Sequence, residues 1–185
     1  MTGLIPGWRA RALAASLCIA ALLAACAEAP PSPLATGATP ETLALAGTMM
    51  DRIGFERIME AQLAKRRETL ITATFEDQLH RSPAEATRDV DEIVMPDIRA
   101  SIPDLKAQYE DATANLFTAD ELRSILNNEQ SPASASAQAK MPEFRERLAA
   151  IGRKWGRRVS LDTLQNHATE LNIPAQVFAQ PGLAL

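Results

Sequence analysis

Helix-start signals recur along this chain, and they constrain its fold more than any other feature. Two stretches have the capping form Ser/Thr-x-x-Glu, in which a hydroxyl and a carboxylate close the same first turn: Ser82-Pro83-Ala84-Glu85 and Thr118-Ala119-Asp120-Glu121. Thr39-Pro40 places a capping hydroxyl before a proline, the order favoured at the first helical position. No sustained apolar/polar alternation predicts a strand after Pro40. We therefore expect an all-α fold.

Apolar residues at helical spacing predict where the first helices run. A helix beginning at Pro40 should turn one stripe toward a core: Leu43, Leu45, Met49, Met50 and Ile53. Gly54 should end or bend this helix. A longer helix should then bury a second stripe: Phe55, Ile58, Leu63, Leu70, Ile71, Phe75 and Leu79. The helix that starts at Ser82 should kink or end near Met95, because Pro96 interrupts the backbone hydrogen bonds.

The second half of the chain repeats the pattern. One helix is expected from Pro103 and another from Thr118. After a Ser- and Ala-rich stretch over residues 131–139, Pro142 should start a strongly periodic helix with one buried face: Phe144, Leu148, Ile151, Trp155 and Val159. Leu161, Leu164, Ala168 and Leu171 continue into a last helix, which Asn172 and Pro174 should end.

The amino-terminal segment has the three parts of an export signal. Arg9 and Arg11 make its start positive, and residues 12–25 form an uncharged, leucine-rich stretch that ends in small residues. This stretch is shorter than the roughly 20 residues that a membrane-spanning helix needs. We predict that residues 1–25 are a signal peptide that is removed from the mature protein.

Cys26 follows Leu23-Ala24-Ala25, and together these residues resemble the lipobox of bacterial lipoproteins. The resemblance implies that Cys26 receives a thioether-linked diacylglycerol, that cleavage occurs before it, and that the new amine is acylated, as by palmitate. The alternative is an ordinary cleaved signal with a free cysteine. Two acyl chains already anchor a protein stably. We therefore expect a protein lipid-anchored in the bacterial cell envelope, at the outer membrane, with its domain facing the periplasm.

Removing 25 of the 185 residues leaves 160, enough for one domain with a single hydrophobic core. The only cysteines are Cys18, which would leave with the signal, and Cys26, which would be acylated, so no internal disulfide is expected. Loss of Arg9 and Arg11 takes the formal net charge from −4 to −6. This acidic balance argues against nucleic acid as a partner, because binding to nucleic acid depends on many basic contacts to phosphate.

The lipid end and the domain are joined by a proline-rich segment. Residues 26–39 comprise the lipidated cysteine and a flexible tether with Pro30, Pro31, Pro33 and Gly37. Proline-rich chain rises about 3.1 Å per residue, so the tether would reach up to roughly 40 Å from the bilayer. Residues 40–185 should then form a single helical, bundle-like domain.

The centre of the chain carries a second resemblance. Tyr109 and Phe117-Thr118-Ala119-Asp120-Glu121-Leu122 are followed by Ser131-Pro132 and Lys140-Met141-Pro142. This run resembles the domain of unknown function 2059 family of exported bacterial proteins, which has an aromatic residue, then F-[ST]-x-x-E-L, then S-P-x-G-[KR]. Asn128-Glu129 stands where the family has an aromatic pair. The resemblance implies a helical fold and an envelope setting, and it brings no catalytic residue with it.

The helix expected after Pro142 carries two further patterns. Gly152 and Gly156 would let a neighbouring helix come close, and we expect packing in a soluble core rather than pairing in a membrane. Basic residues cluster on the same helix and near residue 65. These clusters are Arg153-Lys154-Arg157-Arg158 and Lys65-Arg66-Arg67. They are either solvated helix faces or binding surfaces for anionic lipid headgroups or cell-wall polymers.

Reactive groups are sparse. Asp77-x-x-His80 and His167-x-x-Glu170 each place a carboxylate and an imidazole one turn apart, but di-metal bundles need two Glu-x-x-His motifs and two further glutamates. The sequence has no nucleophile elbow and no phosphate-binding loop. Adjacent acidic pairs such as Asp91-Glu92 and Glu110-Asp111 point in different directions. We predict no catalytic, cofactor-binding or metal site.

These observations favour a non-catalytic interaction or accessory protein that binds an envelope protein partner. The alternative is a binding module that holds an apolar or amphipathic ligand in a cleft between helices. A sizeable apolar pocket would indicate the ligand, and a filled core with an exposed apolar patch would indicate the protein partner. A hydrolase ranks third, and it would need a cleft that joins His80 or His167 to a hydroxyl and a carboxylate.

Overall fold

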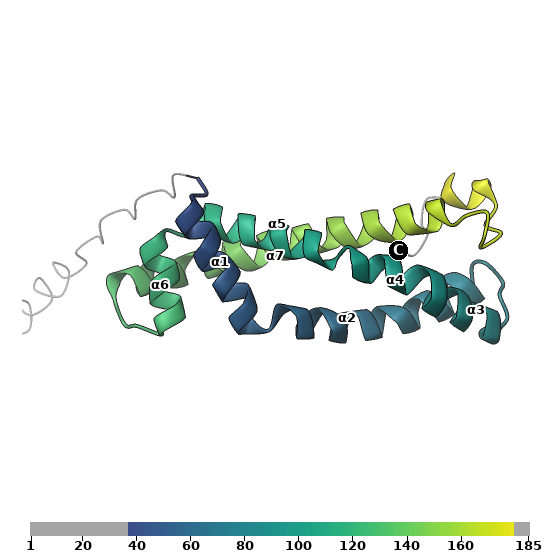
Figure 1. Cartoon of the computed structure of the whole chain (residues 1–185), viewed down its shortest axis with the longest axis horizontal. Coiled ribbons are helices and arrows are strands. Elements are labelled where there is room, and N and C mark those ends of the chain that lie inside the picture. The colour runs from purple at the N-terminus through teal and green to yellow at the C-terminus, as the bar shows by residue number, and fades with distance from the viewer. Residues whose placement is uncertain (1–36, 180–185) are drawn as a thin grey trace, which may run out of the picture. The chain divides into compact units, whose positions relative to one another are not determined.

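The computed structural model describes residues 37–179, and every regular element among them is helical (Figure 1). The all-α prediction is confirmed. The predicted signal peptide, Cys26 and the tether up to residue 36 lie outside the described residues. Within residues 37–179, no helix combines the length and the apolar character needed to cross a membrane.

The first two helices meet at a glycine. Helix α1 (Pro40–Ile53) begins where Thr39-Pro40 predicted. The Thr42 N–H donates to Thr39 Oγ1 at 3.1 Å, and the Thr39 N–H donates to Thr42 Oγ1 at 2.8 Å, so the two residues cap each other. Gly54 ends α1 with φ of 72°, a left-handed conformation that suits glycine, and α2 (Phe55–Thr69) starts at the next residue.

The chain beyond α2 alternates between π-helix and α-helix. Helix α2 continues into the π-helix η1 (Leu70–Glu76). Helix α3 (Pro83–Asp89) begins at the predicted capping box and continues into the π-helix η2 (Val90–Val94) and then α4 (Met95–Ala100). The helical path therefore changes type near Met95 and does not end there. Pro96 lies where η2 passes directly into α4, so its missing N–H coincides with the change of helix type.

The later helices begin near the predicted signals with one exception. Helix α5 (Ile102–Leu116) has Pro103 in its first turn, and α6 (Ala119–Asn127) starts after the Thr118 cap. Helix α7 (Pro132–Asn166) starts well before Pro142, so that predicted start is wrong. Ser131 caps α7 by accepting a hydrogen bond from the Ser134 N–H at 3.1 Å, and Pro142 lies inside the helix.

The last predicted helix also ends earlier than expected. Residues 167–172 form turns, and Asn172 has a left-handed φ of 47° before a short 3₁₀ helix over Ala175–Ala179. The turns still serve the core, because Leu171 and Ile173 are buried. Helical geometry is therefore not needed to bury these two side chains.

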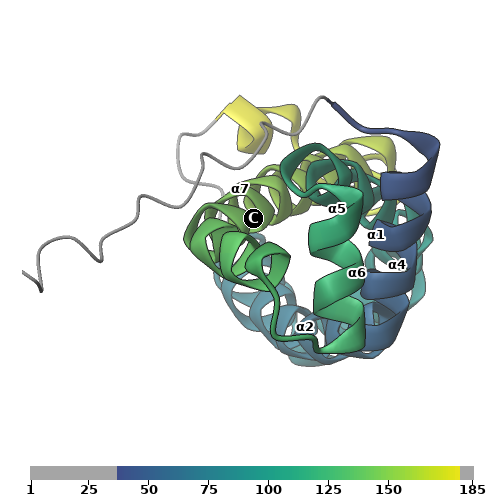
Figure 2. The same ribbon diagram turned by 90° about the vertical axis from the view of Figure 1, so that its left-hand side faces the viewer.

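Two groups of helices share one core. Helices α1, α5, α6 and α7 pack against one another, and η1, α3, η2 and α4 form a second group that also packs against α7. Helix α2 links the groups and lies opposite α5 and α7 in both views (Figures 1 and 2). The largest fully buried side chains come from both groups and include Phe75, Phe117, Met50, Leu70, Met95 and Leu105.

Three residues expected in the core are exposed instead. Leu43 is 40% exposed, and Ile53 and Ile58 are each 45% exposed. Leu43 and Ile53 lie on α1, whereas Ile58 lies on α2, a thinly packed helix in which only Phe55 and Leu63 are buried. A stripe at helical spacing needs a neighbouring element to cover it, and α2 has such a neighbour only at a few positions.

Candidate functional site

Several residues of the run that carries the family resemblance meet where α6 packs against α7, whereas Tyr109 packs against Phe55. Glu121 is buried in the first turn of α6, and Lys140 Nζ of α7 donates to its Oε2 at 2.8 Å. The Thr118 N–H donates to the same oxygen at 2.7 Å, and the Ser136 hydroxyl donates to Oε1. Both carboxylate oxygens are therefore satisfied by hydrogen bonds from α7 and from the N-cap of α6.

The Lys140 ammonium group also has partners other than Glu121. Lys140 Nζ also donates to the Leu116 carbonyl at 3.1 Å and lies 5.9 Å from the centre of the Phe117 ring. Phe117 packs edge-on against Phe144, with ring centres 5.3 Å apart. Burial raises the pKa of Glu121, but the hydrogen bonds from Lys140, Ser136 and Thr118 outweigh it and lower the pKa overall. Glu121 and Lys140 thus form a buried ion pair that links α6 to α7.

A second polar cluster forms around His167, at the end of α7. Its Nε2 lies 3.0 Å from Asp97 Oδ2 on α4, and its Nδ1 lies 3.0 Å from Glu170 Oε2. Both ring nitrogens donate only when the imidazole is protonated, and hydrogen bonds to Glu170 and then Asp97 raise the pKa of His167. An imidazolium with both N–H groups committed has no lone pair with which to act as a general base.

The other residues considered for metal chemistry do not converge. Asp77 and His80 are exposed beside the loop that leads to α3, and His80 has a positive φ of 54°. Glu170 pairs with His167 as the sequence spacing suggested, but the third partner is Asp97 from a distant helix. Among residues 37–179, no group of three or more His, Cys, Asp or Glu side chains has an arrangement that could hold a metal ion.

The two basic clusters differ in their surroundings. On α2, Arg67 makes a two-pronged ion pair with Asp91, with its Nη2 2.7 Å from Oδ2, and burial lowers the pKa of Arg66. On α7, the four basic residues are all exposed: Arg153, Lys154, Arg157 and Arg158. Within the part of the chain that the structure describes, none of these four forms an ion pair.

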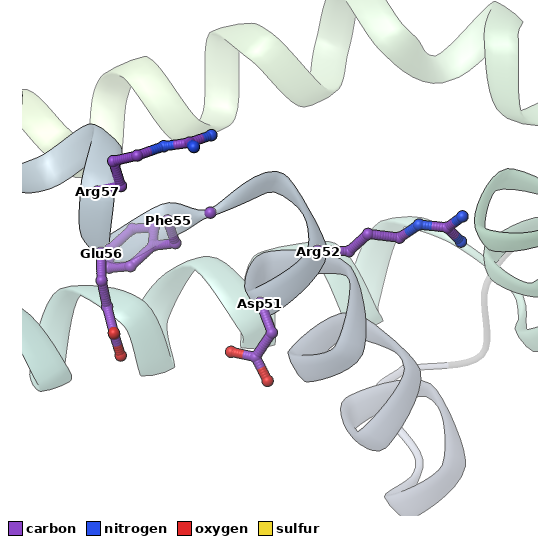
Figure 3. Close-up of a pocket in the computed structure, with 6 residues that line it drawn as sticks. Asp51, Arg52, Phe55, Glu56 and Arg57 are labelled. Carbon is purple, nitrogen blue, oxygen red and sulfur yellow. The ribbon is translucent and has the colours of Figure 1, made fainter.

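A hollow of about 540 Å³ lies at the bend between α1 and α2. Figure 3 shows its lining side chains pointing in different directions: Arg52 and Arg57 extend away from Asp51 and Glu56. Two of them already have partners, since Arg52 donates to the Leu126 carbonyl and Asp51 pairs with Lys106 at 2.5 Å. Polar groups that diverge and bond elsewhere cannot fix one ligand in place.

A second hollow, of about 390 Å³, lies where α4 and α5 meet the end of α7. Its polar wall includes Asp97, Ser101, Asp104, Arg158 and Thr163. Asp97 also binds His167, but that histidine has no free nitrogen to activate Ser101 or Thr163. This hollow has neither the apolar wall expected of a lipid-binding cleft nor a poised nucleophile.

The glycine pattern on α7 is partly explained. A Cβ at Gly152 would lie 2.7 Å from the Tyr109 hydroxyl of α5, so this glycine permits the close approach of a neighbouring helix. A Cβ at Gly156 would meet no atom within 4 Å. Core packing therefore accounts for Gly152 but not for Gly156.

Sequence reasoning missed two parts of this arrangement. The cap-then-proline signal at Ser131-Pro132 could have located the start of α7, because Thr39-Pro40 has the same form. The Glu121–Lys140 pair had no local signal, since its partners lie on different helices.

Comparison with protein-family models, with curated proteins and with solved structures finds no match to this chain. The candidate features therefore depend on the residues and their geometry alone.

Proposed function

We propose that this protein is lipid-anchored in the bacterial cell envelope and that its helical domain serves as a non-catalytic interaction or accessory subunit in the periplasm. One observation carries the proposal. Leu23-Ala24-Ala25-Cys26 closes an uncharged stretch that begins after Arg9 and Arg11, in the order that a lipoprotein signal requires.

The use of polar groups in the domain supports interaction rather than catalysis. Glu121 is enclosed by its hydrogen-bond donors, and both nitrogens of His167 bind carboxylates. Exposed apolar surface supports a protein partner, because Ile53 and Ile58 flank the Gly54 bend and Leu43 lies on the preceding helix. The hollows at the α1–α2 bend and beside the end of α7 give no such support to the alternative of an apolar ligand, because charged side chains line both.

Metabolic labelling with an alkyne-tagged fatty acid tests the anchor. The wild-type chain should be labelled and recovered with membranes, whereas Cys26→Ala should lose the label. Cys18→Ala is the matched control, because it removes the other cysteine from inside the signal peptide and should leave labelling intact. Labelling that persists in Cys26→Ala would contradict the proposal.

Site-specific photocrosslinking in intact cells tests the interaction role. A photoreactive residue at Ile58, which lies in the exposed apolar surface, should yield a discrete crosslinked protein band that mass spectrometry identifies. The same residue at Ala107, exposed on α5, is the control and should not yield that band. A crosslinker at Ile58 or Ile53 that captures no protein, together with a co-purifying lipid, would favour the ligand-binding alternative.

A further inference from the structure

We propose that the basic face of α7, formed by Arg153, Lys154, Arg157 and Arg158, docks the domain on a bilayer that contains anionic phospholipid. The inference rests on the proposed lipid anchor, which would hold the domain close to a membrane. It adds to the anchor a second contact that fixes which side of the domain faces the lipid.

The spacing of the four residues places them on one side of the helix. Successive residues of an α-helix are about 100° apart, so positions 153, 154, 157 and 158 span an arc of about 140°. All four side chains are exposed, while Trp155 and Val159 between them are buried in the core. The core therefore fixes the rotation of α7 and turns the basic residues outward together.

The four cations differ from most others in the domain because they lack ion-pair partners. Elsewhere, Arg67 pairs with Asp91, Arg88 with Asp89, Lys106 with Asp51, Arg123 with Glu41 and Arg147 with Glu143. Across residues 37–179, no carboxylate lies within ion-pair distance of any member of the basic face. These side chains can thus contact anionic headgroups without first breaking an internal pair.

Charge and reach favour a lipid surface as the occupant. The mature chain is acidic overall, so an anionic bilayer repels most of the domain and attracts this basic face. A proline-rich tether would let the domain lie up to roughly 40 Å from the bilayer and no farther. The proposed anchor would therefore keep the basic face close to the same membrane.

A unique cysteine makes the docking measurable. The intact lipidated chain has no free thiol, so a cysteine at Ala150, an exposed position on the same side of α7, can carry a single fluorescent probe. In vesicles of phosphatidylcholine and phosphatidylglycerol, spin-labelled lipid should quench this probe, and in pure phosphatidylcholine it should not. A probe at Ala107 is the positional control and should stay unquenched in both.

Charge reversal tests the residues themselves. Arg153→Glu combined with Arg157→Glu should weaken docking by more than about 25-fold, because loss of each cation costs about fivefold and each added glutamate is repelled. High salt should also weaken docking. The matched control, Arg57→Glu combined with Lys65→Glu, makes the same change in net charge on exposed positions of α2 and should leave docking unchanged. Circular dichroism should show unaltered helix content in both variants.

Failure of the docking and failure of the anchor give different results. The anchor is scored by flotation with pure phosphatidylcholine vesicles, and the docking by quenching that requires phosphatidylglycerol. A chain that floats but shows equal quenching in both vesicle types overturns the docking alone. If the chain does not float, the docking proposal is tested by sedimenting the unlipidated chain with the anionic vesicles. If the unlipidated chain shows no salt-sensitive binding to these vesicles, the docking proposal is overturned. The docking proposal is also overturned if Arg153→Glu combined with Arg157→Glu abolishes binding to insoluble peptidoglycan but leaves binding to the anionic vesicles unchanged.

Discussion

Burial of the Glu121 carboxylate would destabilise the fold if its oxygens lacked partners. Here three donors from the α6 N-cap and from α7 converge on it: the Thr118 N–H, the Ser136 hydroxyl and Lys140 Nζ. The Thr118–Glu121 half of this arrangement could be predicted from the capping-box pattern. The Lys140 half could not, because it depends on how α6 packs against α7.

A double-mutant cycle should measure this pair. Lys140→Met leaves Glu121 ionised without its cation and should lower the free energy of unfolding by about 3 kcal/mol. Glu121→Gln retains hydrogen-bonding groups and should cost about 2 kcal/mol. The double variant should cost less than the sum of the two, which urea unfolding can check. If the losses of the two single variants simply add in the double variant, Glu121 and Lys140 are not directly coupled. The control is Lys65→Met, at an exposed lysine, which should change the free energy of unfolding by less than about 0.5 kcal/mol.

His167 should make stability depend on pH. Its pKa in the folded protein is raised above 6.5 by hydrogen bonds to Glu170 and Asp97. The stabilisation that it provides is therefore fully present below about pH 6.5 and is lost as the pH rises through the folded pKa. His167→Gln should destabilise the protein more at about pH 5.5 than at about pH 8.5. Urea unfolding at the two pH values measures the difference.

The control for this pH effect is the other histidine. His80→Asn removes an exposed imidazole from a loop position whose φ of 54° suits asparagine. This variant should show nearly the same stability difference from wild type at both pH values. An equal loss for His167→Gln at the two pH values would mean that the ion pairs with Asp97 and Glu170 do not stabilise the fold.

At the scale of helices, the hydroxyl caps were the most predictable features. Thr39, Ser82 and Thr118 each cap the helix that their motifs predicted. Prolines were less predictable, because a proline in a first turn is tolerated and one inside a helix is disruptive, and the residue type alone does not distinguish these cases. Pro142 lies within α7, and the helix continues through it.

The two glycines of α7 should respond oppositely to alanine. Gly152→Ala forces the Tyr109 hydroxyl to move and should destabilise the protein by about 1 kcal/mol net of the gain in helix propensity. Gly156→Ala places its methyl group in open space and should stabilise by up to about 1 kcal/mol. Thermal and urea unfolding of the two variants can establish the sign of each effect.

Removal of the tyrosine hydroxyl tests the cause. In a Tyr109→Phe background, the clash at Gly152 is relieved, so Gly152→Ala should become neutral or stabilising. If Gly152→Ala remains destabilising in that background, the close approach of Tyr109 is not the reason for glycine at this position.

At the scale of the whole domain, stability is distributed unevenly. The Leu-, Met- and Phe-rich stripes predicted the core shared by the two groups of helices, but they did not show that α2 would be thinly covered. Its links to the rest include the buried Leu63, the Phe55–Tyr109 ring contact, with centres 5.6 Å apart, and the ion pairs Glu60–Arg99 and Arg67–Asp91. Exposed ion pairs contribute little, so α2 is held mainly by Phe55, Leu63 and its two ends.

Hydrogen exchange should therefore detect local opening of α2. Amides over residues 57–66 should exchange faster than those of α5, which buries Leu105, Thr113, Ala114 and Leu116 along its length. Asp91→Asn removes the charge that holds Arg67 and should speed exchange in α2 further, while leaving α5 unchanged. Equal protection of α2 and α5 would mean that α2 opens only when the whole domain unfolds, so that its few buried residues couple it fully to the core.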